Sequence, residues 1–443
     1  MKNYFLALLI AFSFTTLAQT DARVYDIIQK VSAKNIEADI TTLANFGTRN
    51  TFSDTLSSTR GIGAARRWIK AQFDQISLNC EECLEVFYQK DLVKAASSNR
   101  VPRDTWVVNV VAIQKSKTGS NEYIIMSGDI DSRNSDGSDF IKDAPGANDN
   151  ASGMAGAIEA ARVLSSYEFD ANIVYLGLSG EEQGLFGGAG FARYAQDNNW
   201  DIIGVLNNDM IGNIKGVDGV ISNVDFRIFS EPVPPTETQK QRRLRRFYGG
   251  EVDGISRQLA RYVFKTTKTY MPQLNPMMIY RLDRFGRGGH HRPFNDLGYP
   301  AIRIMEAHEN YTQQHQDIRT QDGIEYGDKL KFVNFNYAKK LTAVNAITMA
   351  SLAWAPKAPT NVAIGGMVAP AVKLRWEKSK NAVGYKIYWR DTTSPTWDYS
   401  RVVGDVDHFS LEGVVIDNFF FGVASIAEDG HESVVVFPSA TFR

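Results

Sequence analysis

The sequence has very little cysteine, since Cys80 and Cys83 are the only two in 443 residues. A four-sulfur zinc site is therefore excluded, because its second pair of ligands is missing. The spacing of the two residues would suit a redox-active pair or half of a mixed zinc site in a reducing compartment. The start of the chain indicates export, and in an exported protein a small structural disulfide between Cys80 and Cys83 is the expected state.

Long apolar runs are also missing beyond the N-terminus. No later stretch approaches the ~18 consecutive apolar residues of a membrane-spanning helix, so no membrane span is expected. The first residues differ, because Lys2 is followed by an apolar segment at 4–14 and by small residues up to Ala18. This pattern is typical of a secretory signal peptide. We expect residues 1–18 to be removed and the mature protein to be secreted or periplasmic.

An excess of charge of either sign is missing as well. Lys and Arg number 49 against 50 for Asp and Glu, which leaves a formal net charge of -1. A nucleic-acid-binding surface usually has a broad basic footprint, so no nucleic-acid partner is expected. One basic cluster, residues 239–247, is interpreted as a solvated helix face or loop.

What the sequence does contain is a series of apolar runs of strand length that alternate with helical patterns. These runs are residues 105–113, 122–128, 172–180, 202–212 and 299–306. Nearly continuous apolar strands between helices are typical of a sheet buried on both faces. The predicted fold for residues 19–355 is α/β, a three-layer α/β/α sandwich with a mostly parallel mixed sheet. The segment 213–289, rich in Arg, Pro and Gly, is expected to form an excursion over one end of the sheet.

The pattern changes near Trp354, where a Pro/Ala linker is followed by short alternating runs. These runs predict an all-β sandwich domain over residues 356–443. Trp376, Tyr385 and Tyr388, with the segment that follows them, resemble a fibronectin type III domain. That resemblance implies a spacer or binding module without chemistry. The linker composition predicts few contacts between the two domains, so that the first should fold without the second.

Acidic residues follow several predicted strands directly. They are Asp129 and Asp131 in "MSGDID", Glu181 and Glu182 in "LSGEE", and Asp209 in "NNDMIG", while Asp149 comes just before a predicted helix. Ligands of open α/β sheets bind beyond the carboxyl ends of the strands. Because converging carboxylates repel one another without a cation, the pattern predicts a metal site. Adjacent glutamates point in different directions, so one can ligate a metal while the other faces a water.

The motifs "PGANDNASG", "LSGEEQGLFGG", "NNDMIG" and "RPFNDLGYPAIR" occur in this order and resemble the secreted di-zinc exopeptidase family. That family includes bacterial leucyl-type aminopeptidases, glutamate carboxypeptidase and, as a mono-zinc relative, glutaminyl cyclase. The resemblance covers about residues 25 to 350. It implies that Asp149 bridges two metals, that Glu182 and Asp209 each ligate one of them, and that Glu181 is the general base.

Both histidine ligands of that family are replaced in this sequence. Asp129 stands in place of the first, and Asp131 keeps the position of the carboxylate that orients it in the family. Gln313 has the spacing of the second, and either His315 or His291 could substitute for it. Asp129 remains a metal ligand in this scheme, but it shifts the site toward oxygen donors. The expected cofactor is zinc, as one or two ions, with Mn, Co, Mg or Ca as alternatives.

The adjacent histidines His290 and His291 allow two interpretations. They could form a hydrogen-bonded loop pair without a direct role. Alternatively, His291 lies at the mouth of the site, where it contacts the substrate or the developing oxyanion.

The predicted function is a secreted metal-dependent exopeptidase of the aminopeptidase type, with a peptide as substrate. A water acidified by one or two cations and deprotonated by Glu181 would attack the carbonyl of an N-terminal peptide bond. A non-catalytic relative that binds peptide or glycan is the first alternative, because both family histidines are replaced. Cyclase-like transfer at one zinc is the second. It is less favoured because Asp129 and Gln313 remove the imidazoles that a single tight zinc would need.

Overall fold

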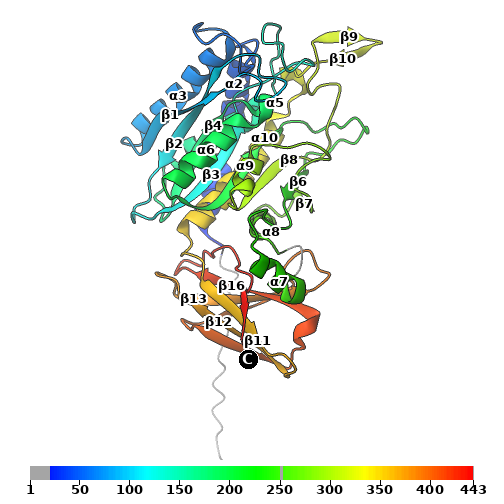
Figure 1. Cartoon of the computed structure of the whole chain (residues 1–443). Helices are drawn as coiled ribbons and strands as arrows, with labels where there is room; N and C mark the ends of the chain where they lie inside the picture. Colours follow the sequence, from blue (N-terminus) through cyan, green and yellow to red (C-terminus); the bar gives the residue numbers. More distant parts are fainter. Residues whose placement is uncertain (1–19, 250–252, 443) are drawn as a thin grey trace, which may run out of the picture.

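The computed structural model describes residues 20–249 and 253–442 of the chain (Figure 1). The expected signal peptide, residues 1–18, lies outside the described residues. None of the helices in these two ranges combines the length and the apolar character that crossing a membrane requires.

The larger part of the protein is built on an eight-stranded mixed sheet in the order β1-β2-β4-β3-β5-β8-β6-β7. Its strands are β1 (Leu84–Val93), β2 (Thr105–Gln114), β3 (Glu122–Asp129), β4 (Asn172–Leu178), β5 (Asp201–Asn208), β6 (Asp225–Ser230), β7 (Asn275–Ile279) and β8 (Ala301–Glu306). The central strands β4, β3, β5 and β8 are parallel. The remaining neighbours are antiparallel except for the pair β6 and β7.

Helices cover both faces of this sheet, which confirms the predicted α/β fold (Figure 1). One face packs against α1 (Ala22–Lys30), α2 (Ala33–Ala44), α3 (Gly61–Asn79), α4 (Ala151–Leu164), α8 (Ile255–Tyr270) and α10 (Phe335–Trp354). The other packs against α6 (Phe186–Asp197) and α9 (His291–Asp296). Alternate residues of β4 enter the two cores, with Ile173 and Tyr175 on one side and Val174 and Leu176 on the other. This period of two is what a strand buried on both faces requires.

The segment predicted as an excursion, residues 213–289, is in fact part of the sandwich. It supplies β6 and β7 at one edge of the sheet and α8 in the larger core. Its two strands are only six and five residues long, so their apolar pattern is weak beside the surrounding Arg, Pro and Gly. The basic cluster forms α7 (Gln239–Tyr248), in which no residue is buried.

Cys80 and Cys83 are joined by a disulfide between the end of α3 and the start of β1. Both side chains are partly buried against the larger core. The bond therefore closes the tight connection from a long helix into an edge strand.

The C-terminal region is all-β, as the sequence predicts. A four-stranded sheet contains β15 (His408–Glu412), β12 (Ala371–Glu377), β11 (Thr360–Gly365) and β17 (Ala440–Thr441). A three-stranded sheet contains β14 (Tyr399–Val403), β13 (Gly384–Asp391) and β16 (Phe419–Ile426). Trp376 and Tyr385, which lie on different sheets, meet in the apolar core between them with ring centroids 5.2 Å apart. In the first domain, β9 (Arg319–Gln321) and β10 (Ile324–Tyr326) form a separate two-stranded hairpin.

The expectation that few contacts join the two domains is wrong. Asp253, just before α8, forms an ion pair with Arg390 of β13, in the other domain, at 2.7 Å. It also pairs with Arg261 of α8 at 3.1 Å. All three side chains are at most 2% exposed. Lys265 of α8 also pairs with Glu432 at 2.7 Å. The linker composition could not predict these contacts, because they are made by residues of the two domains that lie outside the linker.

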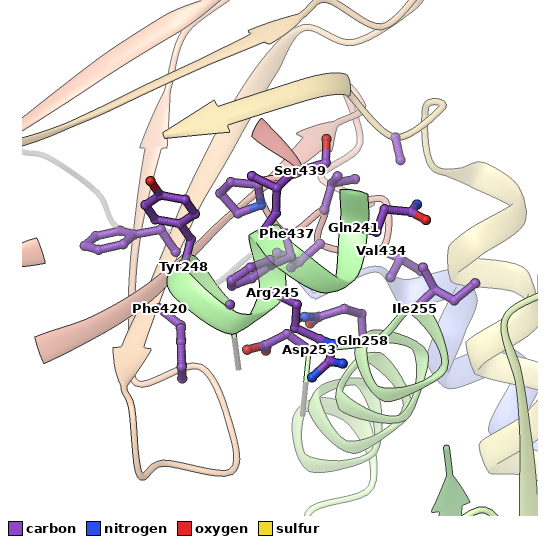
Figure 2. A pocket seen from close by; sticks show the side chains of 18 of the residues that line it. Gln241, Arg245, Tyr248, Asp253, Ile255, Gln258, Phe420, Val434, Phe437 and Ser439 are labelled. Carbon is purple, nitrogen blue, oxygen red and sulfur yellow. Dashed lines mark hydrogen bonds between the residues drawn. The ribbon is translucent and has the colours of Figure 1, made fainter. Parts of the chain in front are cut away.

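A cavity of about 870 Å³ lies between α7, α8 and the C-terminal domain (Figure 2). Its wall includes Tyr248 and Ile255 from the first domain and Phe420, Val434 and Phe437 from the second. None of the carboxylates that follow the sheet strands lines it. The cavity is therefore separate from the candidate site at the strand ends.

Candidate metal centre

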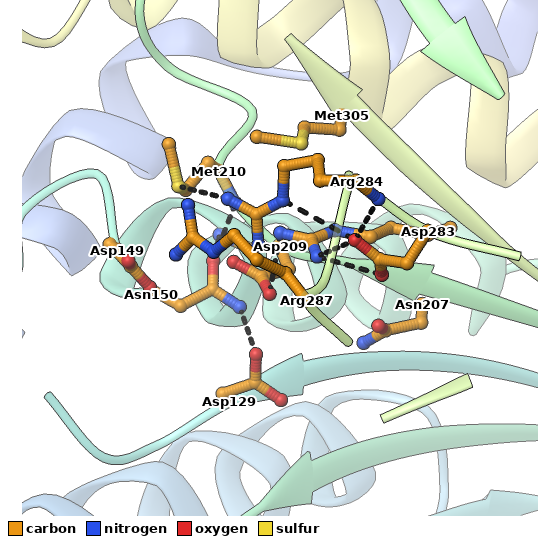
Figure 3. A network of polar contacts seen from close by, with 12 residues as sticks. Asp129, Asp149, Asn150, Asn207, Asp209, Met210, Asp283, Arg284, Arg287 and Met305 are labelled. Carbon is orange, nitrogen blue, oxygen red and sulfur yellow. Dashed lines mark hydrogen bonds and ion pairs between the residues drawn. The ribbon is translucent and has the colours of Figure 1, made fainter. Parts of the chain in front are cut away.

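The parallel strands β4, β3 and β5 bring acidic side chains together at the carboxyl ends of the strands. β3 ends at Asp129, α5 (Glu181–Gly184) begins shortly after β4, and Asp209 directly follows β5. Asp149 lies in the loop that leads into α4. Because the three strands are parallel neighbours, these side chains gather around the same end of the sheet, as Figure 3 shows for Asp129, Asp149 and Asp209.

Asp131 fixes the direction of the adjacent glutamates. Its carboxylate accepts hydrogen bonds from the backbone N–H groups of Glu181 at 3.2 Å and Glu182 at 3.1 Å. Asp131 is only 1% exposed, so no water competes for these bonds. It thus satisfies the first free N–H groups of α5 and sets where the two glutamate side chains leave the backbone.

Asp149, Glu182 and His315 form a compact cluster in which one ligand atom from each lies within 4.8 Å of the others. Nε2 of His315 is 2.8 Å from Oδ2 of Asp149 and 2.9 Å from Oε1 of Glu182. The backbone of His315 has a φ of 53°, in the left-handed region that a non-glycine residue seldom adopts. Of the two histidines that the sequence offers in place of Gln313, the structure brings His315 to the cluster.

Further polar side chains hold the cluster in place. Gln314 donates a hydrogen bond to Asp149 at 2.9 Å, and Arg133 forms an ion pair with Glu182 at 2.6 Å. Burial by itself would raise the pKa of Asp149, but His315 and Gln314 hold it well below its usual range. Burial lowers the pKa of His315, whereas the carboxylates of Glu182 and Asp149 raise it to about 9. The cluster therefore favours a positive charge between its two carboxylates.

This donor set fits a zinc ion. Catalytic zinc sites commonly have three protein ligands, drawn from imidazole and carboxylate groups, and leave a further position open. Asp149, Glu182 and His315 supply two carboxylates and one imidazole at mutual distances that one cation can span. A cation would bind in competition with the proton that His315 otherwise carries.

Asp129 and Asp209, also expected to be ligands, do not join this cluster. Oδ1 of Asp129 is 2.5 Å from Nδ1 of His290, and its Oδ2 accepts a hydrogen bond from Asn150 at 2.7 Å. Oδ2 of Asp209 is 2.8 Å from Nη2 of Arg303. Within residues 20–249 and 253–442, neither aspartate belongs to a group of three close ligand residues. The structure therefore brings together two of the four expected ligands and pairs the other two with nitrogen donors.

Glu181 lies next to the cluster and is partly exposed. No residue that the structure describes donates a hydrogen bond to its carboxylate. Burial, and then the carboxylates of Glu182 and Asp209, raise its pKa well above the usual range. A carboxylate without a hydrogen-bond donor keeps its oxygens free, and a raised pKa makes its ionised form a stronger base.

The structure does not place His291 at the mouth of the site. Its side chain is fully buried, and Nε2 lies 2.8 Å from the carbonyl oxygen of Leu282. His291 is the first residue of α9, and its imidazole is also 3.6 Å from Oδ2 of the buried Asp283. The neighbouring His290 is the histidine that reaches the acidic edge, through Asp129.

Two arginines of the site were not identified from the sequence. Arg303 is fully buried within β8, and Arg133 contacts both Glu182 and His315. A sequence feature was present for Arg303, since it is the only charged residue inside the apolar run "YPAIRIM". Arg133 has no such feature, because it lies in a polar loop where arginine is common.

Known proteins resemble this chain in sequence and in fold. The family model described as peptidase family M28 matches residues 109–332. A probable zinc metalloprotease of Pyrenophora tritici-repentis is 35% identical over 94% of this chain and 98% of its own length. Another, from Leptosphaeria maculans, is 39% identical over 93% of this chain and 96% of its own.

Solved structures share the fold at much lower identity. LapB from Legionella pneumophila has a TM-score of 0.54 at 16% identity, with 75% of each chain covered. The glutaminyl cyclase of Macrostomum lignano has a TM-score of 0.53 at 10% identity, covering 75% of this chain and 92% of its own. Since the family model spans half of the sequence and the fungal relatives match nearly all of it, the chain belongs to peptidase family M28.

Proposed function

We propose that this protein is a secreted metal-dependent exopeptidase of the aminopeptidase type, with Asp149, Glu182 and His315 as the metal ligands. The convergence of these three side chains is the observation that carries the proposal. They come from two loops and from α5 at the carboxyl ends of the parallel strands, where α/β proteins bind their ligands. Membership of a peptidase family and relatives named as zinc metalloproteases support zinc as the cation.

Glu181 is the general base in this proposal. A divalent cation, when bound, would lower the pKa of a water and polarise the carbonyl of the scissile bond. Glu181 takes a proton from the attacking water and passes it to the departing amine. Asp131 holds the backbone of Glu181 and Glu182, so that the base and the ligand keep separate directions.

The secreted location is part of the proposal. It is supported by the signal-peptide pattern of residues 1–18 and by the disulfide between Cys80 and Cys83. Aminopeptidase specificity is supported by the motifs that resemble bacterial leucyl-type aminopeptidases, and a peptide substrate follows from the family.

The activity can be tested with paired peptides that have either a free or an acetylated N-terminus. The mature chain, supplied with zinc, should hydrolyse the free peptides and leave the acetylated ones intact, and a chelator should abolish turnover. Cleavage of both kinds at internal bonds would contradict the exopeptidase proposal. Peptide binding without turnover, in zinc, manganese or cobalt, would favour the non-catalytic alternative.

A further inference from the structure

We propose that the centre holds a single divalent cation and that the guanidinium of Arg303 supplies the fixed positive charge at the position of a second one. This rests on the proposed function, which assigns Asp149, Glu182 and His315 to one cation. It departs from the two-metal arrangement that the motifs of the chain imply.

Arg303 is held rigidly beside Asp209. It lies within β8, whose six residues are all buried, and its own side chain is fully buried. Nη2 is 2.8 Å from Oδ2 of Asp209, while Nη1 is 2.9 Å from Oδ2 of Asp283 and 3.0 Å from the carbonyl of Gly288. A buried guanidinium must keep such partners, because leaving a charge unpaired in the interior is very unfavourable. These contacts place the guanidinium of Arg303 between Asp209 and Asp283.

A cation on Asp209 would have to share that carboxylate with the guanidinium. Metal–oxygen bonds to zinc are about 2.0 to 2.2 Å long, so the ion would lie within a few Å of Nη2. Two positive charges at that separation in a buried site repel strongly. Arg303 gives Asp209 an opposite charge, which it shares with Asp283.

Asp129, the other residue of the second position, is also engaged. His290 contacts one of its oxygens at 2.5 Å, and Asn150 donates to the other at 2.7 Å. Asn150 is itself fixed as the N-cap of α4, where its side chain accepts a hydrogen bond from the backbone of Gly153. Both oxygens of Asp129 are therefore directed toward nitrogen donors rather than toward a shared cation.

The first position also has an arginine, because Arg133 pairs with Oε2 of Glu182 at 2.6 Å, but the remaining ligand atoms there lie close together. One ligand atom from each of Asp149, Glu182 and His315 lies within 4.8 Å of the others. Asp129 and Asp209 contribute to no such group in the parts of the chain that the structure describes. At the second position, Arg303 pairs with one oxygen of Asp209 and both oxygens of Asp129 have nitrogen partners, while Oδ1 of Asp209 and Nε2 of His290 are buried without a hydrogen-bond partner.

The test is the zinc content of the mature protein after incubation with excess zinc and removal of unbound metal. Elemental analysis and native mass spectrometry should both give one zinc per chain. His315→Ala should lower the bound zinc at least tenfold, whereas Asp209→Asn and Asp129→Asn should still bind one. Circular dichroism establishes that each variant is folded.

Two zinc ions per wild-type chain would overturn the inference and leave the proposed peptidase function standing. No bound zinc would overturn both. Loss of the zinc in a folded Asp209→Asn variant would also overturn the inference, because Asp209 would then be a ligand. The wild-type measurement decides the matter even if a variant fails to fold.

Discussion

Nε2 of His315 lies 2.8 Å from Oδ2 of Asp149, at the point where loops from two different parts of the chain meet. In the family motif, the spacing places a histidine ligand at the position of Gln313. His315, two residues later, supplies an imidazole in its place. It makes the candidate centre a mixed nitrogen and oxygen site, which suits zinc better than an all-oxygen site would.

His315, rather than Gln313, should therefore decide whether the protein binds zinc. We expect His315→Ala to weaken zinc binding at least tenfold, because one of three ligands is lost. Gln313→Ala is the matched control, since it changes the same loop two residues away and should leave affinity within about twofold. Isothermal titration of metal-free protein with zinc measures both. Equal losses in the two variants would show that the loop as a whole, and not the imidazole, is what matters.

Substitution of Glu181 should affect turnover, whereas substitution of Glu182 should affect zinc binding. Glu181→Gln should retain zinc and fold but lower the turnover rate by ~10² to 10⁴, the usual contribution of a positioned base. Glu182→Gln should lower zinc content itself, because it removes a charged ligand. Steady-state kinetics and elemental analysis on the same preparations separate the two effects. A Glu181→Gln variant with wild-type turnover would remove the base from the mechanism.

The buried ion pairs between the domains should make the C-terminal domain a contributor to stability. Asp253→Asn leaves Arg261 and Arg390 buried without their anion, which should cost about 3 to 5 kcal/mol in the free energy of unfolding. Asp405→Asn is the control, because Asp405 is 58% exposed in its pair with Lys378 and should cost less than about 1 kcal/mol. Urea denaturation measures both variants. Similar small effects would mean that the buried carboxylate of Asp253 does not stabilise the contact between the domains.

The same interface should weaken in acid. Burial by itself would raise the pKa of Glu432, but Lys265 and Lys386 lower it to about 2. Because the unfolded pKa is about 4.3, its stabilising contribution is complete above that value and is lost as the pH falls toward 2. The difference in melting temperature between wild type and Glu432→Gln should therefore be constant from pH 7 to 5 and shrink below pH 4. A difference that does not depend on pH would contradict this role of the carboxylate.

The sheet and the acidic residues at its edge could be predicted because both depend on short-range patterns. Each central strand is an apolar run, and parallel strands necessarily bring their carboxyl ends together. Asp149 and Glu182 lie beside these ends, so their convergence follows from the order of the elements. The last two strands of the sheet order, β6 and β7, were missed because five or six residues give too short a pattern.

The partners of the expected ligands could not be predicted in the same way. Arg303 and Asp209 come from different strands, and nothing in the motif around Asp209 indicates that a guanidinium will occupy its side. His315 reaches the cluster through a loop with a left-handed residue, whose path a count of residues does not give. The fully buried position of His291 likewise depends on its contacts with Leu282 and Asp283, which its own motif does not indicate.

The most direct test of the metal centre is an anomalous difference map from zinc-soaked crystals, recorded at the zinc absorption edge. A peak should lie within about 2.0 to 2.2 Å of Nε2 of His315 and of oxygens from Asp149 and Glu182. Its absence from that point in crystals soaked with saturating zinc, or a peak bound only by Asp129 and Asp209, would contradict the account.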